Sequence, residues 1–598
     1  MKARPLRQLE KMATEHLLEE FPPVGTKAWE AAIAHDLKGA DYEKRLIWRT
    51  EEGLAVKPYY RAEDLKGLAY MDAAPGDFPY RRGVRATGGW RIREEIDATD
   101  AEEANRAACA AVAAGAEGIA FGRILVESSG ELELLLKDLG EVPVHFERAG
   151  ERLIRLLLER MHNNPTGERG IAAEISTGCD ALASLEFAAE VIEAAPAGFV
   201  PFAIHGEALE ENGATAVEQV GLTLAAGVDF LAAMDERGVN VNRAAPRIEF
   251  GFAMGSNYFF EIAKLRAFRM VWARTVQSFG GTGEAARARI AARTSRWSKT
   301  VYDPHVNILR GATEAMAAVL GGADLVMVQP FDACYEEPNE ASRRLARNTQ
   351  LLLKHEAWFN RVADAGGGSY YLETLTDFLA REGWKSMQRI EARGGYRKAR
   401  AEGAIRRMLE QSLAAREQAV AARRRVMVGM NQYANRAERA LDRIDEQRMN
   451  KTRRGARAYE ELRLRTERHA AQGGKTPQVL LAEIGDVKIR VARASFAANF
   501  FACAGFEIAA RRFKNAREIA AAEGDLIVLC SADRECAALA AELMPKLKAL
   551  GRKTPVIVAG NPENAAEIAA AGIADFVHAR SEPLEVLTKW QQRFGIKG

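Results

Sequence analysis

The chain between about residue 85 and residue 390 alternates short apolar runs with longer helical patterns. The helical patterns, such as Ala101–Ala114 and Tyr258–Thr275, place apolar residues three and four positions apart. The apolar runs are Gly118–Leu125, Val142–Arg148, Gly170–Ser176, Phe199–Gly206, Ile248–Ser256, Ala288–Ser295, Asp324–Phe331 and Arg361–Ser369. Eight strand-then-helix units in succession predict an α/β fold with a (β/α)8 TIM barrel rather than an open doubly wound sheet.

A second alternating pattern begins at Thr476. Its predicted strands are Gln478–Ile484, Asp525–Cys530, Pro555–Ala559 and Asp575–His578, with helices between them. Strands alternating with helices predict a parallel sheet of the flavodoxin kind. We therefore divide the chain into an N-terminal extension (1–84), the barrel (85–390), a helical linker or belt (391–474) and a flavodoxin-like domain (475–598). The extension opens with a charged amphipathic helix, and Trp29–Leu37 predicts another.

The linker region differs from both domains in its charge. Residues 391–469 contain 21 Lys and Arg against 11 Asp and Glu, a net charge of +10. The residues of this region show helical spacing, which favours solvated helices that link the two domains or wrap a partner. Nucleic-acid binding is a weaker interpretation, because no aromatic or glycine pattern accompanies the charge.

The whole chain carries a formal net charge of only +2, which implies neither an acidic nor a basic partner. Its six cysteines are scattered and form no C-x-x-C pair. This spacing argues against a disulfide framework or a zinc site and favours a reducing, cytoplasmic location. No signal-peptide pattern and no run of eighteen apolar residues occurs, so we expect no membrane segment.

Active-site residues of a TIM barrel lie at the carboxyl ends of its strands. The stretch 170–236 contains no Lys or Arg, so this part of the predicted mouth offers no guanidinium group for an anionic substrate. His205, near the end of the fourth predicted strand, is a candidate acid, base or hydrogen-bond donor, although a structural role is the simpler interpretation. Tyr302, Asp303 and His305 follow the sixth run, where loop capping explains them equally well.

The second domain lacks the usual ligand-binding signatures. The loop after its first strand contains no G-x-G-x-x-G, and no histidine occurs between His469 and His578. A metal or corrin ligand there would need an imidazole or a thiolate. Cys503 lies in a predicted helix and Cys530 ends a predicted strand, so we expect both to be buried in the core.

Several motifs follow one another along the chain: Trp48–Gly53 with Lys57-Pro58, Phe78–Gly83, Glu210–Ala214, Phe252–Arg269, Thr294–Asp303, Arg344–Gln350, Asp364–Leu372 and Val428–Tyr433. Each is short, but the ordered set is specific. Taken in order, these motifs resemble the adenosylcobalamin-dependent methylmalonyl-CoA mutase family over nearly the whole chain.

The family's functional residues do not carry over. The family's W-T-I-R-Q-Y appears as Trp90–Glu95, so Glu95 stands where the active-site tyrosine is expected. Ala208 stands where the family's catalytic histidine is expected, and the arginine that grips the substrate carboxylate belongs to the segment without basic residues. The family's cobalamin motif, D-x-H-x-x-G, is matched by Val487–Ala492. Val487 thus replaces its aspartate, Ile489 the lower axial histidine and Ala492 the glycine.

These losses resemble the small (beta) subunit of the heterodimeric bacterial enzyme. The resemblance implies a non-catalytic subunit that pairs with a large (alpha) subunit, which holds adenosylcobalamin and the acyl-CoA substrate. It implies no catalytic residue, cofactor or metal site in this chain. Two alternatives stay open. The chain could be an independent acyl-CoA enzyme using Glu95, His205 or Glu207, or a module that binds CoA or cobalamin without turnover.

Overall fold

The computed structural model describes residue 21 and residues 24–163 and 174–597, and the chain divides into two units at Asp64. The smaller unit contains α2 (Thr26–Asp36), α3 (Tyr42–Leu46), and β1 (Trp48–Arg49) paired antiparallel with β2 (Ala55–Val56). Within its described residues only Val56 is buried. The helix predicted over the first twenty residues lies outside the described part of the chain.

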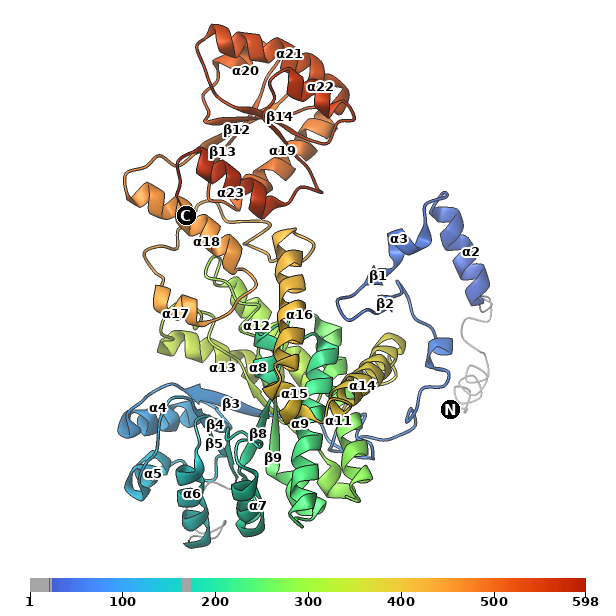
Figure 1. Ribbon diagram of the computed structural model, residues 1–598, viewed down its shortest axis with the longest axis vertical. Helices are drawn as coiled ribbons and strands as arrows, with labels where there is room; N and C mark the ends of the chain where they lie inside the picture. Colours follow the sequence, from blue (N-terminus) through green and yellow to red (C-terminus); the bar gives the residue numbers. More distant parts are fainter. Residues whose placement is uncertain (1–20, 22–23, 164–173, 598) are drawn as a thin grey trace, which may run out of the picture. The chain divides into compact units, whose positions relative to one another are not determined.

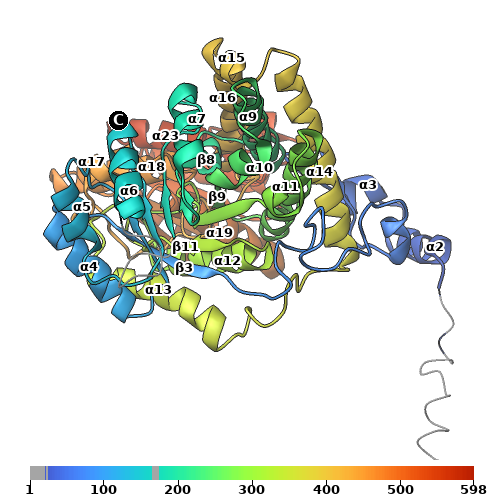
Figure 2. The same ribbon diagram turned by 90° about the horizontal axis from the view of Figure 1, so that it is seen from below.

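The larger unit contains the predicted barrel, which is confirmed (Figures 1 and 2). Its sheet is parallel throughout, in the order β7-β6-β5-β4-β3-β11-β10-β9-β8. Hydrogen bonds from the Ala203 amide to the Cys179 carbonyl (2.8 Å) and from the Ala181 amide to the Ala203 carbonyl (3.1 Å) link its two ends. The strands are β3 (Arg91–Ile96), β4 (Gly118–Phe121), β5 (Val144–Phe146), β6 (Ile175–Thr177), β7 (Phe199–Val200), β8 (Phe202–His205), β9 (Ile248–Met254), β10 (Arg289–Thr294) and β11 (Leu325–Met327).

Two details of the strand prediction were wrong. Arg361–Ser369 forms a loop, where Asp364 (φ 48°) and Gly368 (φ 84°) adopt left-handed conformations that a strand cannot contain. The first barrel strand is instead β3, whose charged sequence hid it. Because β7 and β8 are two parts of one strand interrupted at Pro201, the barrel still has eight, and His205 ends the fifth strand rather than the fourth.

Helices surround the barrel strands (Figure 2). They are α4 (Ala101–Ala113), α5 (Ser129–Leu136), α6 (Glu151–Asn163), α7 (Leu185–Ala194), α8 (Gly206–Glu211), α9 (Ala216–Glu236), α10 (Val241–Ala244), α11 (Tyr258–Ser278), α12 (Val306–Leu320), α13 (Glu340–His355) and α14 (Tyr370–Glu391). By length and composition α9 could cross a membrane, but 72% of its most apolar window is buried within the protein. Residues 65–84 belong to this unit, and Arg81 is fully buried with Glu373 of α14 (Nε–Oε2 2.7 Å).

The flavodoxin-like sheet is also confirmed, with the parallel order β13-β12-β14-β15-β16. Its edge strand β13 (Glu507–Arg512) was not predicted, because its polar sequence lacks an apolar run. The other elements are β12 (Gln478–Glu483), α19 (Val487–Ala502), α20 (Ala516–Ala521), β14 (Leu526–Cys530), α21 (Asp533–Ala549), β15 (Val556–Ala559), α22 (Ala565–Ala570), β16 (Asp575–Val577) and α23 (Pro583–Arg593). Alternate strand residues face two apolar layers. One contains α18 (Arg457–Ala471), α19 and α23, and the other contains α20–α22.

The linker consists of α15 (Tyr396–Ala401), α16 (Ala404–Ala421), α17 (Glu446–Lys451) and α18 (Arg457–Ala471). One apolar cluster combines Trp297 and Val301 of the barrel with Leu462 of α18 and Phe500 of α19. Polar contacts join the same parts. The Val301 amide donates to Glu460 of α18 (2.9 Å), and Arg416 of α16 donates to Glu210 of α8 (3.0 Å). The linker thus contacts both the barrel and the C-terminal sheet.

Candidate functional site

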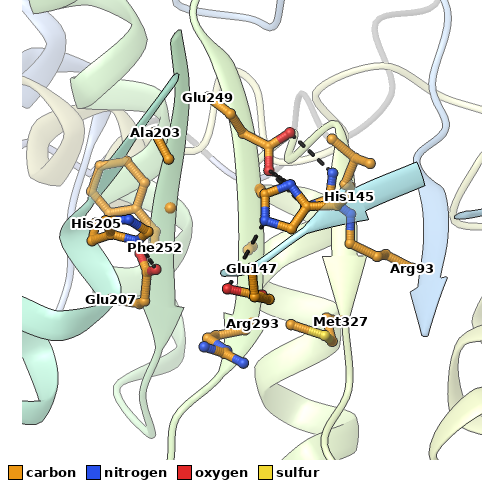
Figure 3. Close-up of a pocket in the computed structure, with 14 residues that line it drawn as sticks. Arg93, His145, Glu147, Ala203, His205, Glu207, Glu249, Phe252, Arg293 and Met327 are labelled. Atoms are coloured by element: carbon orange, nitrogen blue, oxygen red, sulfur yellow. Dashed lines mark hydrogen bonds and ion pairs between the residues drawn. The ribbon is translucent and has the colours of Figure 1, made fainter. Parts of the chain in front are cut away.

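The interior of the barrel is occupied by a buried network of charged side chains (Figure 3). Glu249 of β9 accepts two hydrogen bonds from Arg93 of β3, at 2.6 and 3.0 Å, and one from Nε of Arg289 of β10, at 2.9 Å. Burial alone would raise the pKa of Glu249, but Arg93 and Arg289 outweigh it and hold that pKa well below its usual range. Glu249 is therefore ionised and pairs with two cations inside the barrel.

His145 of β5 completes this network. Its Nδ1 lies 2.8 Å from the Ser176 hydroxyl and 3.7 Å from Glu249. Burial, reinforced by the charge of Arg93, lowers the pKa of His145 to about 4, so the ring is neutral near pH 7. A neutral, hydrogen-bonded imidazole shielded from solvent is a packing element here.

The side chains leave little free space inside the barrel. The interior cavity measures about 40 Å³ and is lined by Arg93, His145, Glu147, His205, Glu249 and Met327, among others. A water molecule in the liquid takes up about 30 Å³, so the cavity has room for one or two waters. An acyl group of a substrate does not fit in this space without displacement of the charged network.

His205, the histidine singled out from the sequence, lies at the carboxyl end of β8, as predicted. Its Nδ1 is 2.9 Å from Glu207 and its Nε2 is 2.9 Å from the Gly178 carbonyl. Burial would lower the pKa of His205, but the hydrogen bond and negative charge of Glu207 raise it to about 9. Both neighbours are acceptors, so both ring nitrogens donate and neither is free to act as a base.

Glu95, which replaces the expected tyrosine, lies on β3 with its side chain 25% exposed. Arg293 of β10 donates to it at 3.3 Å. Burial would lower the pKa of Arg293, but Glu95 and Glu147 outweigh burial and raise it. The sequence reasoning missed this arginine at the mouth, because it considered only the stretch 170–236. The sequence does contain a signal for Arg293. It lies two residues before Ser295, near the end of the apolar run Ala288–Ser295, where side chains of the barrel mouth are expected.

Ala208, at the position of the expected catalytic histidine, lies exposed in α8. Its methyl side chain can neither donate nor accept a proton, and α8 itself contains no histidine. The nearest titratable group along the chain is Glu207, which is committed to His205.

The three polar residues after β10 have structural roles. The Tyr302 hydroxyl is fully buried and donates to Glu467 of α18 at 3.0 Å. The Asp303 amide donates to Glu438 at 2.8 Å, and the His305 ring packs on Phe331 with 5.2 Å between centroids. The contacts of Tyr302 and Asp303 hold the loop against the linker.

The stretch that aligns with the cobalamin motif was expected to be a loop, but it forms the first turns of α19. Asp486 caps this helix by accepting a hydrogen bond from the Ile489 amide (3.1 Å). Val487 is 60% exposed and Ile489 is 37% exposed, so neither side chain is a core residue. Ala492 is exposed on the next turn. Within the described residues, no three His, Cys, Asp or Glu side chains are grouped so as to hold a metal ion.

Comparisons with known proteins bear on this combination of barrel and sheet. The methylmalonyl-CoA mutase family model matches residues 49–123 and 182–494. The chain belongs to the methylmalonyl-CoA mutase family. The small subunit of methylmalonyl-CoA mutase from Porphyromonas gingivalis is 37% identical over 98% of this chain and 99% of its own length. The small subunit from Streptomyces virginiae is 31% identical over 97% of this chain and 98% of its own.

A relative named simply methylmalonyl-CoA mutase, from Rhizobium meliloti, is 32% identical over 70% of this chain and 65% of its own length. The family is one of isomerases that depend on adenosylcobalamin. Full-length similarity is thus found with relatives named as small subunits, and partial similarity with this mutase.

Cys503 and Cys530, predicted as core residues, are buried as expected.

Proposed function

We propose that this chain is the non-catalytic small (beta) subunit of a heterodimeric, adenosylcobalamin-dependent methylmalonyl-CoA mutase. In this proposal, a paralogous large (alpha) subunit interconverts methylmalonyl-CoA and succinyl-CoA. The filled barrel carries the proposal. The Arg93–Glu249–Arg289 network leaves about 40 Å³, and removing its charges to admit a substrate would leave buried ions without partners.

The residues at the mouth support the same conclusion. Acid–base catalysis needs a group that can exchange a proton with the substrate. His205 donates from both ring nitrogens to protein acceptors, Glu95 is paired with Arg293, and Ala208 has no titratable group. Neither His205 nor the degenerate positions Glu95 and Ala208 offer a free proton donor or acceptor, so we assign no catalytic residue to this chain.

The C-terminal domain does not fit adenosylcobalamin. A cobalt ligand would need a nitrogen or sulfur donor, and Ile489 has neither. Asp486 caps the first turn of α19. In this turn Val487 and Ile489 stand where the family's motif has its aspartate and histidine. We expect the partner subunit, and not this chain, to hold the cofactor and the acyl-CoA.

The N-terminal unit supports a role in assembly. Its described residues bury only Val56, whereas Trp29 (46% exposed) and Trp48 (49% exposed) are accessible. A unit this small without a core of its own gains stability by covering apolar surface on another chain. We infer that this unit contributes to binding the large subunit. Six unpaired thiols fit a cytoplasmic complex.

Assembly and cofactor binding can be tested together. Co-expression with the large paralogue, followed by size-exclusion chromatography with light scattering, is expected to yield a 1:1 complex. Equilibrium dialysis against hydroxocobalamin is expected to show no saturable binding to the isolated chain and one cobalamin per heterodimer. Stoichiometric binding to this chain alone would contradict the proposal, as would its failure to associate with the paralogue.

A further inference from the structure

A groove of about 690 Å³ lies between the barrel and the linker; it shares His205 with the small interior cavity and has Ala208 in its wall. Helices α8 and α9 form one wall, and α15 and α16 form the other. Its large apolar side chains are Leu182, Ile204, Leu209, Leu222, Ile405, Leu409 and Leu413, and Asn212 and Thr223 add uncharged polar groups. Its volume falls within the range of about 300–1,000 Å³ that is typical of small-molecule sites.

The wall formed by α16 is anchored near its C-terminal half. Gly213, at φ 102°, packs so closely under Leu413 that an added Cβ would lie 2.5 Å from the Cβ of Leu413. Arg416 donates to the buried Glu210 at 3.0 Å. These two contacts fix the distance between α16 and α8, so α16 cannot move inward to fill the groove.

The other end of the groove is anchored through α15. The Arg397 amide donates to Asp229 of α9 at 2.8 Å, and Gly395 brings the backbone close to the same carboxylate. Because both ends of this linker segment are held, the space between them is a persistent feature of the fold.

The charged side chains at the rim cancel one another. Three arginines, Arg400, Arg406 and Arg453, face three acids, Asp180, Glu410 and Glu417. Arg400 lies 3.4 Å from Asp180 and Arg406 lies 3.9 Å from Glu410. His205, which also lines the groove, is paired with Glu207. A ligand therefore gains by burying apolar surface and not from a net charge.

Tyr396 supplies a hydroxyl group to the lining, in addition to the uncharged polar groups of Asn212 and Thr223. Burial raises the pKa of its hydroxyl, which thus stays protonated and can donate or accept. We propose that the groove between α8, α9, α15 and α16 binds an uncharged, mainly aliphatic small molecule with one hydroxyl or carbonyl group. This site is independent of the proposed subunit role.

Titration calorimetry of the full chain with 1-hexanol and 1-octanol tests the assignment. Each additional methylene is expected to tighten binding about fourfold, so 1-octanol should bind roughly fifteenfold more tightly than 1-hexanol. Because the rim is neutral, octanoate and octylammonium should bind about equally. Tyr396→Phe should weaken 1-octanol binding about fivefold through the lost hydrogen bond.

Variants on the exposed side of α16 separate the groove from nonspecific binding. Ala414→Trp, which lines the groove, should abolish binding. Ala415→Trp, exposed on the same helix outside the groove, should leave it unchanged and serves as the matched control. Three results would overturn the proposal: no saturable heat with 1-octanol, equal binding by both tryptophan variants, or loss of binding when the large paralogue is added. The last result would assign the groove to a side chain of that protein.

Discussion

Replacement of Glu249 by Gln tests whether the charge network holds the barrel together. The substitution keeps the side chain's size but removes the one carboxylate that is hydrogen-bonded to Arg93 among the described residues. The remaining partner of Arg93 there is the Ser176 hydroxyl, at 3.4 Å. Arg289 retains Glu174. One buried cation is therefore left without a counter-charge, and we expect a loss of about 3–5 kcal/mol in the free energy of unfolding.

The control is Glu284→Gln. Glu284 pairs with Arg287 at 2.6 Å but its side chain is 80% exposed, so its loss should cost less than about 1 kcal/mol. Replacing Arg93 and Glu249 together by Met should cost less than Glu249→Gln alone, because no buried ion then lacks its partner. Urea unfolding followed by circular dichroism, with the barrel transition compared between variants, measures each change. Equal effects of Glu249→Gln and Glu284→Gln would refute this account of the interior.

Three further predictions concern other parts of the molecule. The buried His145 has a pKa of about 4, against about 6.5 in the unfolded chain. Between these two pH values the unfolded state binds more protons than the folded state. The free energy of unfolding should therefore fall by about 2 kcal/mol from pH 7 to pH 5. His145→Gln should remove this slope in urea titrations, and an unchanged slope would contradict the assignment. Gly213→Ala forces a Cβ to within 2.5 Å of Leu413 and should displace α16 at a cost of about 2–4 kcal/mol, seen as faster tryptic cleavage of the linker. In the assembled complex, Glu95→Gln and His205→Gln should leave turnover within about twofold, and a hundredfold fall would show that chemistry occurs in this chain.

The apolar pattern of the sequence was enough to predict both sheets and most of their strands. It failed at β3 and β13, where charged residues occupy strand positions. In β3, Arg93 faces the barrel interior and pairs with Glu249, 156 residues away in the sequence. From periodicity alone, such a charged side chain is predicted to be solvent-exposed, because its buried partner is known only from the closed barrel. The prediction of a strand at residues 361–369 was wrong for the opposite reason. Left-handed backbone conformations at Asp364 and Gly368 make this segment a loop, although its apolar residues alternate as in a strand.

The candidate site was predictable only in part. The motifs alone were enough to propose Glu95, Ala208 and Ile489 as the residues at the family's functional positions, and these assignments stay predictions. The sequence could not show that the interior is filled, because the charged and polar side chains that fill it come from strands far apart in the chain, among them β3, β5, β9 and β10. The groove beside α16 was equally hidden, because its walls are separated by more than a hundred residues of chain.

The most direct test of the account is an isomerase assay on the purified chain, supplied with adenosylcobalamin and methylmalonyl-CoA, alone and after addition of the large paralogue. We expect no succinyl-CoA from the single chain and full turnover from the heterodimer. Turnover by the single chain would show that the filled barrel opens to substrate and that a cobalt ligand exists outside α19, and the proposed subunit role would then be wrong.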